Sequence, residues 1–264
     1  MIFKNKKVWI TGASSGIGEA LAYAFAKEGA QLILSARNET ELERVRANCQ
    51  DAVSVEVLHL DIGDHDSVFE KAETLLSRID AVDILINNAG LSQRSLALET
   101  DLSVTKRLLD VDLVGTIAVT KSVLDAMIKQ KSGQIVVITS IMGKLGAPLR
   151  SSYAAAKHGL HGYFDTLRAE TYKDGIRVLL VCPGFVRTNV SINALVADGN
   201  TQGTMDEATE NGFSPDEVAA KILKAIKKGK EEIVIAKGKV LLATYLKRFA
   251  PWLLSRMVRN AKTT

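Results

Sequence analysis

Short apolar runs alternate with longer amphipathic segments along most of the chain. Most runs are rich in β-branched residues and leucine without alternating polar positions, which is typical of strands buried on both faces of a parallel sheet. The run at 53–60 is different, because Val53, Val55 and Val57 alternate with polar residues, and it predicts a strand near a sheet edge. The predicted strands are 8–11, 32–36, 53–60, 84–88, 135–140, 178–183 and 233–236.

The segments between these runs have helical periodicity. Asp66, and Ser214 followed by Pro215, predict helix starts, whereas Gly29 and Gly175 predict helix ends. Alternation of strands and helices with right-handed crossovers predicts an α/β protein with a doubly wound parallel sheet. The predicted helices are 16–28, 39–48, 66–78, 102–129, 150–173 and 215–228.

One long stretch, 184–213, has no strong periodicity and is rich in Asn, Gly, Thr and Asp. Long irregular segments in compact domains are usually functional or disordered. This one follows the carboxyl end of a predicted strand, where doubly wound sheets bind their ligands. We therefore expect 184–213 to cover the ligand crevice and to bind substrate.

The composition excludes several classes of protein. The chain has 264 residues, of which 47% are hydrophobic and 24% charged, and this is too apolar for a disordered chain. Two cysteines cannot form a disulfide scaffold, and no apolar stretch reaches the length of a membrane span. The first residues, 1–7, contain no apolar core of the secretory type. We expect an intracellular, cytoplasmic protein.

The net charge of +4 is unevenly distributed. Seven of the 34 Lys and Arg residues lie from Lys237 onward, where no Asp or Glu occurs, so the preceding chain carries 27 basic against 30 acidic residues. No nucleic-acid-binding module accompanies this charge, and we expect no nucleic-acid partner.

The last residues, 237–264, form a basic amphipathic extension beyond a catalytic domain predicted to span 1–236. Its apolar side chains, among them Trp252, could pack on the body, on a partner subunit or over the pocket. The alternative is peripheral contact with a membrane through 239–260. Pro251 should divide any helix in this region.

A glycine-rich turn follows the first predicted strand and opens the first helix. Gly12 permits a tight turn, Gly16 allows close approach of a pyrophosphate, and Gly18 allows close packing of helix and sheet. The amino end of the helix then supplies N–H donors and a positive dipole end. A tight turn without a ligand has the same glycines, but the strand–turn–helix context favours dinucleotide binding.

The second predicted strand ends in Ser35-Ala36-Arg37, without the Asp or Glu that holds the ribose 2′-hydroxyl of NAD. A guanidinium suits a bidentate contact with a 2′-phosphate. Arg37 could also be a solvated residue at a helix start. We nevertheless predict NADP(H) as the cofactor.

Tyr153 and Lys157 are four residues apart and share one face of a predicted helix. An ammonium near a phenol favours the phenolate, so Tyr153 could donate a proton to a carbonyl or accept one from an alcohol. Ser140 ends a predicted strand and could bind the same substrate oxygen. His158 and His161 follow Lys157 without an acidic partner at metal-ligand spacing, so we expect packing roles for them and no metal site.

Taken together, these motifs resemble the short-chain dehydrogenase/reductase family over residues 6–236. The matching residues are TGASSGIG at 11–18, Leu60-Asp61, Asn87-Asn88-Ala89-Gly90, Ser140, Tyr153 with Lys157, and Pro183-Gly184 with Val186 and Thr188. The resemblance implies a single-domain Rossmann fold with seven parallel strands in the order 3-2-1-4-5-6-7. It also implies transfer of a hydride between NADPH and a carbonyl or alcohol carbon, and a homodimer or homotetramer.

The resemblance also implies the contacts of a bound cofactor. Asp61 and Ile62 would face the adenine, and Lys157 would hold the nicotinamide ribose as well as assisting Tyr153. The remaining contacts would come from Gly12, Ser14, Ser15, Gly16, Ile17, Gly18, Asn88, Ala89, Gly90, Pro183, Gly184, Val186 and Thr188.

Asp112 departs from the family pattern, which has Asn in the middle of the long fourth helix. The resemblance implies that the family's Asn acts mainly through its backbone carbonyl, which holds a water of the proton relay to Lys157. An Asp keeps that carbonyl while adding a carboxylate near Lys157, and we therefore expect Asp112 to be a catalytic residue of this relay. The chain is also similar to the dehydrogenase/reductase member seven and 7B subgroup, where Asp occurs at this position and the substrates are poorly defined lipophilic carbonyls or alcohols. A cofactor-binding protein without catalysis, or a membrane-surface scaffold, is the alternative reading.

Overall fold

The computed structural model describes residues 2–259 of the chain. Met1 and residues 260–264 lie outside this range, and with them the end of the predicted extension 237–264 and position 260 of the expected membrane contact.

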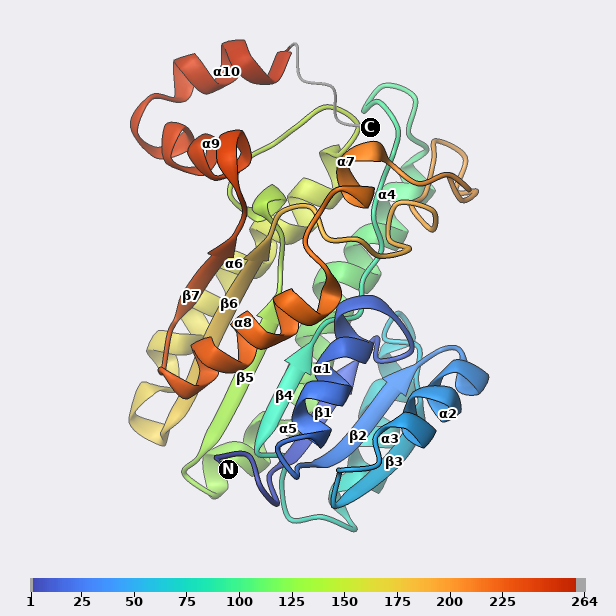
Figure 1. The fold of residues 1–264 in the computed structure, drawn as a ribbon, viewed down its shortest axis with the longest axis vertical. Helices are drawn as coiled ribbons and strands as arrows, with labels where there is room; N and C mark the ends of the chain where they lie inside the picture. The colour runs from blue at the N-terminus through green and yellow to red at the C-terminus, as the bar shows by residue number, and fades with distance from the viewer. Residues whose placement is uncertain (1, 260–264) are drawn as a thin grey trace.

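Seven parallel strands form one sheet in the order β3-β2-β1-β4-β5-β6-β7 (Figure 1). The predicted fold class and strand order are confirmed, and β3 lies at an edge, as its alternating pattern predicts. The strands are β1 Lys7–Thr11, β2 Gln31–Ala36, β3 Ser54–His59, β4 Ile84–Asn87, β5 Gly133–Ile138, β6 Ile176–Pro183 and β7 Glu232–Ile235.

Helices cover both faces of the sheet. In Figure 1, α1 and α8 lie in front of it, and α6 lies behind. The α-helices are α1 Gly16–Ala26, α2 Glu39–Asn48, α3 His65–Leu76, α4 Leu102–Leu109, α5 Thr116–Lys129, α6 Ser151–Glu170, α7 Glu207–Glu210, α8 Pro215–Lys227, α9 Gly238–Phe249 and α10 Pro251–Arg259. The π-helical turn η1 is Asp110–Gly115, and the 3₁₀ turns are η2 Ile141–Gly143 and η3 Tyr172–Asp174.

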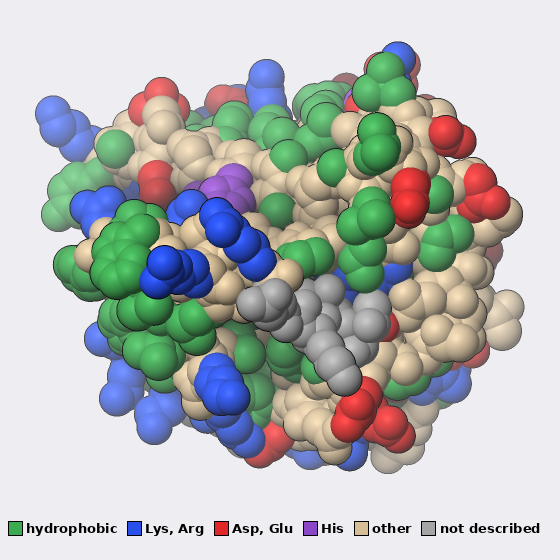
Figure 2. Space-filling model, turned by 90° about the horizontal axis from the view of Figure 1, so that it is seen from above, with side chains coloured by type: hydrophobic (Ala, Val, Ile, Leu, Met, Phe, Trp, Pro, Cys, Tyr) green, Lys and Arg blue, Asp and Glu red, His purple; other side chains and the backbone are tan. Residues whose placement is uncertain are grey.

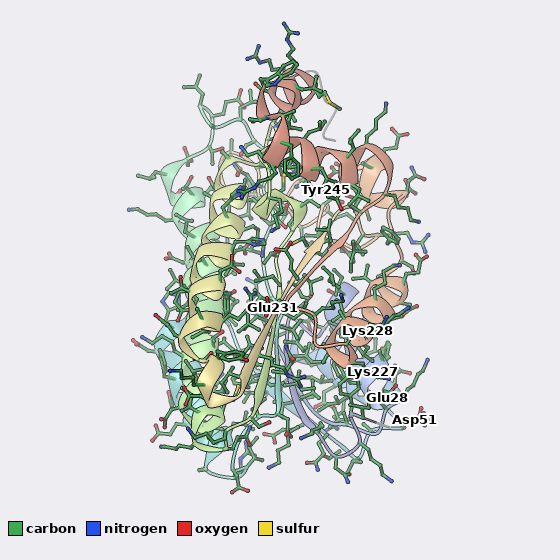
Figure 3. The ribbon with its side chains drawn as sticks, turned by 90° about the vertical axis from the view of Figure 1, so that its left-hand side faces the viewer. Glu28, Asp51, Lys227, Lys228, Glu231 and Tyr245 are labelled. Carbon is green, nitrogen blue, oxygen red and sulfur yellow. The ribbon has the colours of Figure 1, made fainter. Side chains whose placement is uncertain are left out.

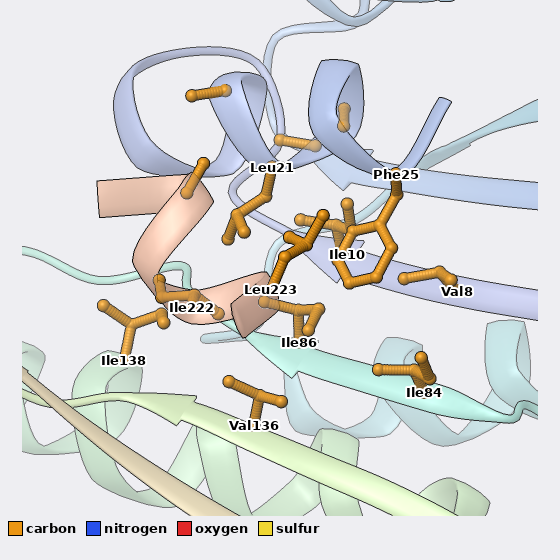
Figure 4. Close-up of a cluster of buried hydrophobic side chains, with 14 of the residues drawn as sticks. Val8, Ile10, Leu21, Phe25, Ile84, Ile86, Val136, Ile138, Ile222 and Leu223 are labelled. Atoms are coloured by element: carbon orange, nitrogen blue, oxygen red, sulfur yellow. The ribbon is translucent and has the colours of Figure 1, made fainter. Parts of the chain in front are cut away.

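Two hydrophobic clusters stabilise the sheet, one on each face. In the front cluster, Phe25 of α1 and Ile222 of α8 pack with Ile10 of β1 and Ile86 of β4, and all four are fully buried (Figure 4). Full burial of such a side chain contributes about 1.5–3 kcal/mol. Lys227 of α8 forms an ion pair with Glu28, which follows α1, at 2.6 Å (Figure 3). The front helices are thereby held to each other as well as to the sheet.

Most helix ends agree with the sequence. Ser214 forms a capping box with Glu217, and Gly29 and Gly175 have the left-handed backbone expected after helices. The prediction for α3 is wrong by two residues, because Asp64 and not Asp66 accepts the hydrogen bond from the Ser67 amide at 3.2 Å. Either aspartate satisfies the sequence pattern, since both precede the apolar positions of the helix.

The predicted helix 102–129 is interrupted in its middle. It consists of α4, the π-helical turn η1 and α5 in direct succession. A π-helical turn contains an extra residue and often occurs at a functional site. Here the turn contains Asp112, whose side chain is fully buried.

The C-terminal segment forms two helices separated at Pro251, as predicted. Their inner face includes Ala243, Leu246 and Leu254 and packs around Ile141 and Met142 of η2. The extension therefore packs on the body of the protein, which was one of the predicted alternatives, through one of its two faces. Within residues 2–259, no helix combines the length and the apolar character needed to cross a bilayer.

Candidate active site

A cleft with a volume of about 730 Å³ opens at the carboxyl ends of the central strands. It lies where the strand order reverses between β1 and β4, which is the usual ligand site of a doubly wound sheet. Its lining includes the glycine turn after β1, the ends of β2 and β5, the start of α6 and parts of the segment 184–213.

The turn between β1 and α1 is closely packed and requires its glycines. Gly12 has a φ of 65°, and Gly18 lies so close to the Gly12 carbonyl that a Cβ atom would clash with it. The side-chain amide of Asn88 donates to the carbonyls of Thr11 and Gly12, at 3.0 Å each, and fixes this turn against β4. Ser15, at the start of α1, makes no side-chain cap, and the first residues of the helix line the cleft. The first amide groups of a helix have no partner within it and can bind an anion.

The end of β2 places Arg37 in the cleft lining. Its side chain is exposed and makes no hydrogen bond or ion pair within the described chain. The nearby Glu41 also lines the cleft, but its carboxylate is paired with Arg44 at 2.7 Å. Arg37 is therefore an unpaired cation at this corner within the described part of the chain. Together with the glycine turn, these residues fit a dinucleotide.

Three of the predicted catalytic residues line the same cleft. The Ser140 hydroxyl oxygen accepts a hydrogen bond from the Met142 amide at 3.1 Å, which leaves its hydrogen available to a ligand. Tyr153 and Lys157 lie one turn apart on α6, with the Lys157 Nζ 5.5 Å from the centre of the Tyr153 ring. Lys157 is buried, so its charge is poorly screened by water.

Asp112 lies directly beneath this cluster and is not part of the cleft lining among the described residues. Its Oδ2 is 3.3 Å from the Lys157 Nζ in a buried ion pair, without an aligned hydrogen bond at that oxygen. Its Oδ1 accepts from the Leu91 amide at 2.6 Å, and its backbone carbonyl accepts from the Thr116 hydroxyl at 3.0 Å. The backbone of Gly90 lies close to this ion pair. A Cβ atom at Gly90 would be 3.2 Å from both the Asp112 carboxylate and the Lys157 ammonium.

Burial and charge act in opposite directions on this pair. Burial raises the pKa of the Asp112 carboxyl, and the ammonium of Lys157 offsets only part of that effect. Burial, the largest single influence, lowers the pKa of Lys157, but the contributions of Asp112 and, to a lesser extent, Tyr153 together outweigh it and hold that pKa above its usual value. The two side chains therefore depend on each other for their charged forms.

The substrate end of the cleft is held together by residues that the sequence motifs did not indicate. Gln93, fully buried, accepts with its Oε1 from the amides of Ser152 and Tyr153 at 2.8 and 3.3 Å. It thus provides a hydrogen-bond acceptor for amide groups in the first turn of α6 and positions the backbone of Tyr153. Its partners are about 60 residues away in sequence, so no local pattern could reveal it.

A buried charge cluster joins the segment 184–213 to the loop after β4. Arg94 contacts one oxygen of Asp206 through two nitrogens, at 2.6 and 2.8 Å, and Arg150 approaches the same oxygen at 3.6 Å. Burial, followed by the charge of Arg94, lowers the pKa of Arg150 to about 10. Both arginines line the cleft, so its substrate end is polar at one side.

The structure brings nearly all predicted cofactor contacts to one surface. Pro183, Gly184, Val186 and Thr188 line the cleft, and the Thr188 methyl lies over Gly16. The lining also contains Ser14, Ser15, Ile17, Asp61, Ile62, Ala89 and Gly90. Among the described residues, Gly18 and Asp112 are the predicted site residues outside the lining. His161 is buried against Thr139 and Cys182, and burial lowers its pKa to about 4, as suits a packing residue.

Fold and site together define an oxidoreductase of the nucleotide-binding Rossmann class. The sequence model of the short chain dehydrogenase family matches residues 6–197. The chain belongs to the short-chain dehydrogenase/reductase family.

Relatives and solved structures agree with this assignment. A dehydrogenase/reductase SDR family protein 7-like from Anopheles gambiae is 40% identical over 98% of this chain and 85% of its own length. The dehydrogenase/reductase SDR family member 7B from Bos taurus is 40% identical over 97% of this chain and 81% of its own. An alcohol dehydrogenase from Thermococcus sibiricus, complexed with 5-hydroxy-NADP, has a TM-score of 0.77 at 27% identity and covers 88% of this chain and 96% of its own.

Proposed function

We propose that the protein is an NADP(H)-dependent oxidoreductase acting on the carbonyl, or the corresponding secondary alcohol, of a lipophilic substrate. The observation that carries the proposal is the meeting of Ser140, Tyr153 and Lys157 in one cleft with the glycine turn. Ile141, Met142 and Leu195 supply apolar lining at the substrate end. When bound, the nicotinamide supplies the hydride, and the protein supplies orientation and proton transfer.

Each polar residue has a distinct part in this proposal. The Ser140 hydroxyl donates to the substrate oxygen and orients the carbonyl over the cleft floor. The Tyr153 phenol delivers the proton to that oxygen, or removes it in the oxidation direction. The Lys157 ammonium stabilises the phenolate that remains and would also bind the ribose. Asp112 acts through Lys157 and is therefore a positioning residue.

The experiment that tests the proposal measures NADPH oxidation over a panel of lipophilic ketones and aldehydes. Turnover of at least one compound that depends on Tyr153 supports the enzyme. Binding of NADPH without turnover on any compound would favour a non-catalytic cofactor-binding protein instead.

Reversing the charge of Arg37 should weaken the binding of NADPH more than the binding of NADH. In Arg37→Glu, a charge-assisted contact with the 2′-phosphate is replaced by repulsion, so we expect the KM for NADPH to rise about 10- to 100-fold. The KM for NADH should change little, because NADH has no 2′-phosphate. Arg46→Glu, on the outer side of α2, is the matched control and should leave both values unchanged. Equal weakening of both cofactors would contradict the role of Arg37.

Removing the charge of Asp112 should change the pH dependence of reduction. Proton transfer by Tyr153 needs the charged ammonium of Lys157, so activity should fall as the pH rises through the pKa of Lys157. The Asp112 carboxylate holds the pKa of Lys157 above its usual value, and Asp112→Asn removes that charge and leaves burial to lower the pKa. We expect the midpoint of the alkaline fall in kcat/KM to move to lower pH.

The matched control is Asp110→Asn, an exposed carboxylate on the same π-helical turn. Arg150 also interacts electrostatically with Tyr153, and both variants retain it. An unchanged midpoint in Asp112→Asn, or a shift to higher pH, would show that Asp112 does not act through the charge of Lys157.

We further propose a homodimer or homotetramer in the cytoplasm. The oligomer rests on the family resemblance. Cys49 and Cys182 are both buried and form no disulfide, which supports a reducing compartment such as the cytoplasm.

A further inference from the structure

The outer face of α9 and α10 is apolar, basic and exposed. The apolar side chains on it are Leu242, Tyr245 and Phe249 of α9 and Trp252 of α10, with exposed fractions of 51%, 58%, 80% and 67%. Residues 242, 245 and 249 recur at the spacing of one helix face. Figure 3 shows Tyr245 on α9 in the upper part of the molecule, with Glu28 and Lys227 lower in the same view.

Two aromatic side chains occupy the corner between the helices. Phe249 ends α9, Pro251 begins α10, and Trp252 follows it directly. The proline prevents one continuous helix, so these aromatic side chains lie at the turn itself. Single exposed apolar residues are normal, but a contiguous apolar surface of this kind marks an interaction site.

The charge on this segment has one sign. Residues 237–259 contain six Lys or Arg residues and no Asp or Glu. Lys247, Arg248, Arg256 and Arg259 are all exposed beside the apolar positions. Figure 2, which views this end of the molecule, shows hydrophobic side chains gathered at the left with Lys and Arg side chains around them.

The opposite face of the same helices is packed on the catalytic region. Leu246 and Leu254 belong to one cluster with Ile141 and Met142, which also line the cleft, and with the ring of Tyr153. Any partner that binds the outer face of α9 and α10 is therefore close to the substrate end of the cleft.

We propose that the outer face of α9 and α10 docks on an anionic lipid bilayer. Trp and Phe side chains beside Lys and Arg suit the boundary between headgroups and acyl chains, and each basic residue near such a surface adds attraction to anionic lipid. A second copy of the chain fits less well, because a two-fold contact through this face would oppose like charges. The proposal goes beyond the catalytic function and does not depend on it.

The test is flotation of the full chain with vesicles. We expect binding to vesicles of phosphatidylcholine with phosphatidylserine, little binding to phosphatidylcholine alone, and loss of binding at high salt. Phe249→Ser with Trp252→Ser should lower the partition coefficient about tenfold or more. Lys247→Glu with Arg248→Glu should also lower it about tenfold or more.

The matched controls are Tyr172→Ser and Lys173→Glu, which remove an aromatic side chain and reverse a charge at exposed positions on η3. They should leave partition unchanged, and thermal unfolding should be similar for all variants. Failure of the native chain to bind anionic vesicles would overturn the proposal. A second outcome would also overturn it. If the α9 and α10 variants changed the molar mass of the protein measured by light scattering but not its partition to vesicles, the outer face would be a contact between copies of the chain. Neither readout requires turnover, so these outcomes are separate from those that test the enzyme.

Discussion

Replacement of Tyr153 by Phe is expected to lower kcat by about 10²- to 10⁴-fold, the usual contribution of a positioned acid or base. The ring keeps its place on α6, because Gln93 holds the backbone of Tyr153 and not its hydroxyl. The fluorescence titration of NADPH should therefore give a Kd close to that of the native chain. Steady-state reduction of the best ketone in the panel measures the loss.

The matched control is Tyr163→Phe, a second tyrosine on α6 that packs edge-on against Phe164, outside the cleft. It removes the same hydroxyl from the same helix and should retain activity. If Tyr153→Phe kept its kcat, the proton would have to come from another group and the proposed role of Tyr153 would be wrong.

Removing one member of the buried pair should strongly destabilise the fold. Asp112→Leu leaves the Lys157 ammonium buried without its carboxylate, and the loss of one partner of such a pair costs about 3–5 kcal/mol of unfolding free energy. Urea unfolding followed by circular dichroism measures this change. The side chains of Asp112 and Lys157 are 0% and 5% exposed, so solvent screening reduces the effect little.

The double variant Asp112→Leu with Lys157→Met is the internal control. Apolar side chains in place of both charges should recover most of the lost stability, because no charge is then left unpaired. An unfolding free energy of Asp112→Leu equal to that of the native chain would show that water reaches Lys157. Additive losses in the double variant would show that the two charges do not stabilise each other.

The sequence predicted the sheet well because its signals are local. Buried parallel strands such as β5 appear as unbroken apolar runs, and Ser214 with Pro215 marks the start of α8 in consecutive residues. The glycine turn was equally clear, since a positive φ at Gly12 and the lack of space at Gly18 both demand glycine.

The features that were missed depend on contacts between distant residues. The π-helical turn at Asp112 interrupts a segment whose composition suits an ordinary helix throughout. Gln93, Arg94 and Asp206 have no motif around them, and their roles appear only when the loop after β4 meets the segment 184–213. Asp112 could be singled out by its departure from the family pattern, but its contact with Leu91 could not be predicted.

The ion pair between Arg94 and Asp206 has a consequence for the order in which a growing chain can assemble its parts. Strands β1 to β4 form adjacent positions of the sheet from the first third of the sequence, so the glycine turn can be complete early in synthesis. The substrate end needs Asp206, which is 112 residues beyond Arg94. Contacts of such long range form late because closing the intervening loop costs entropy. A nascent or truncated chain could thus acquire its nucleotide half long before it can enclose a substrate.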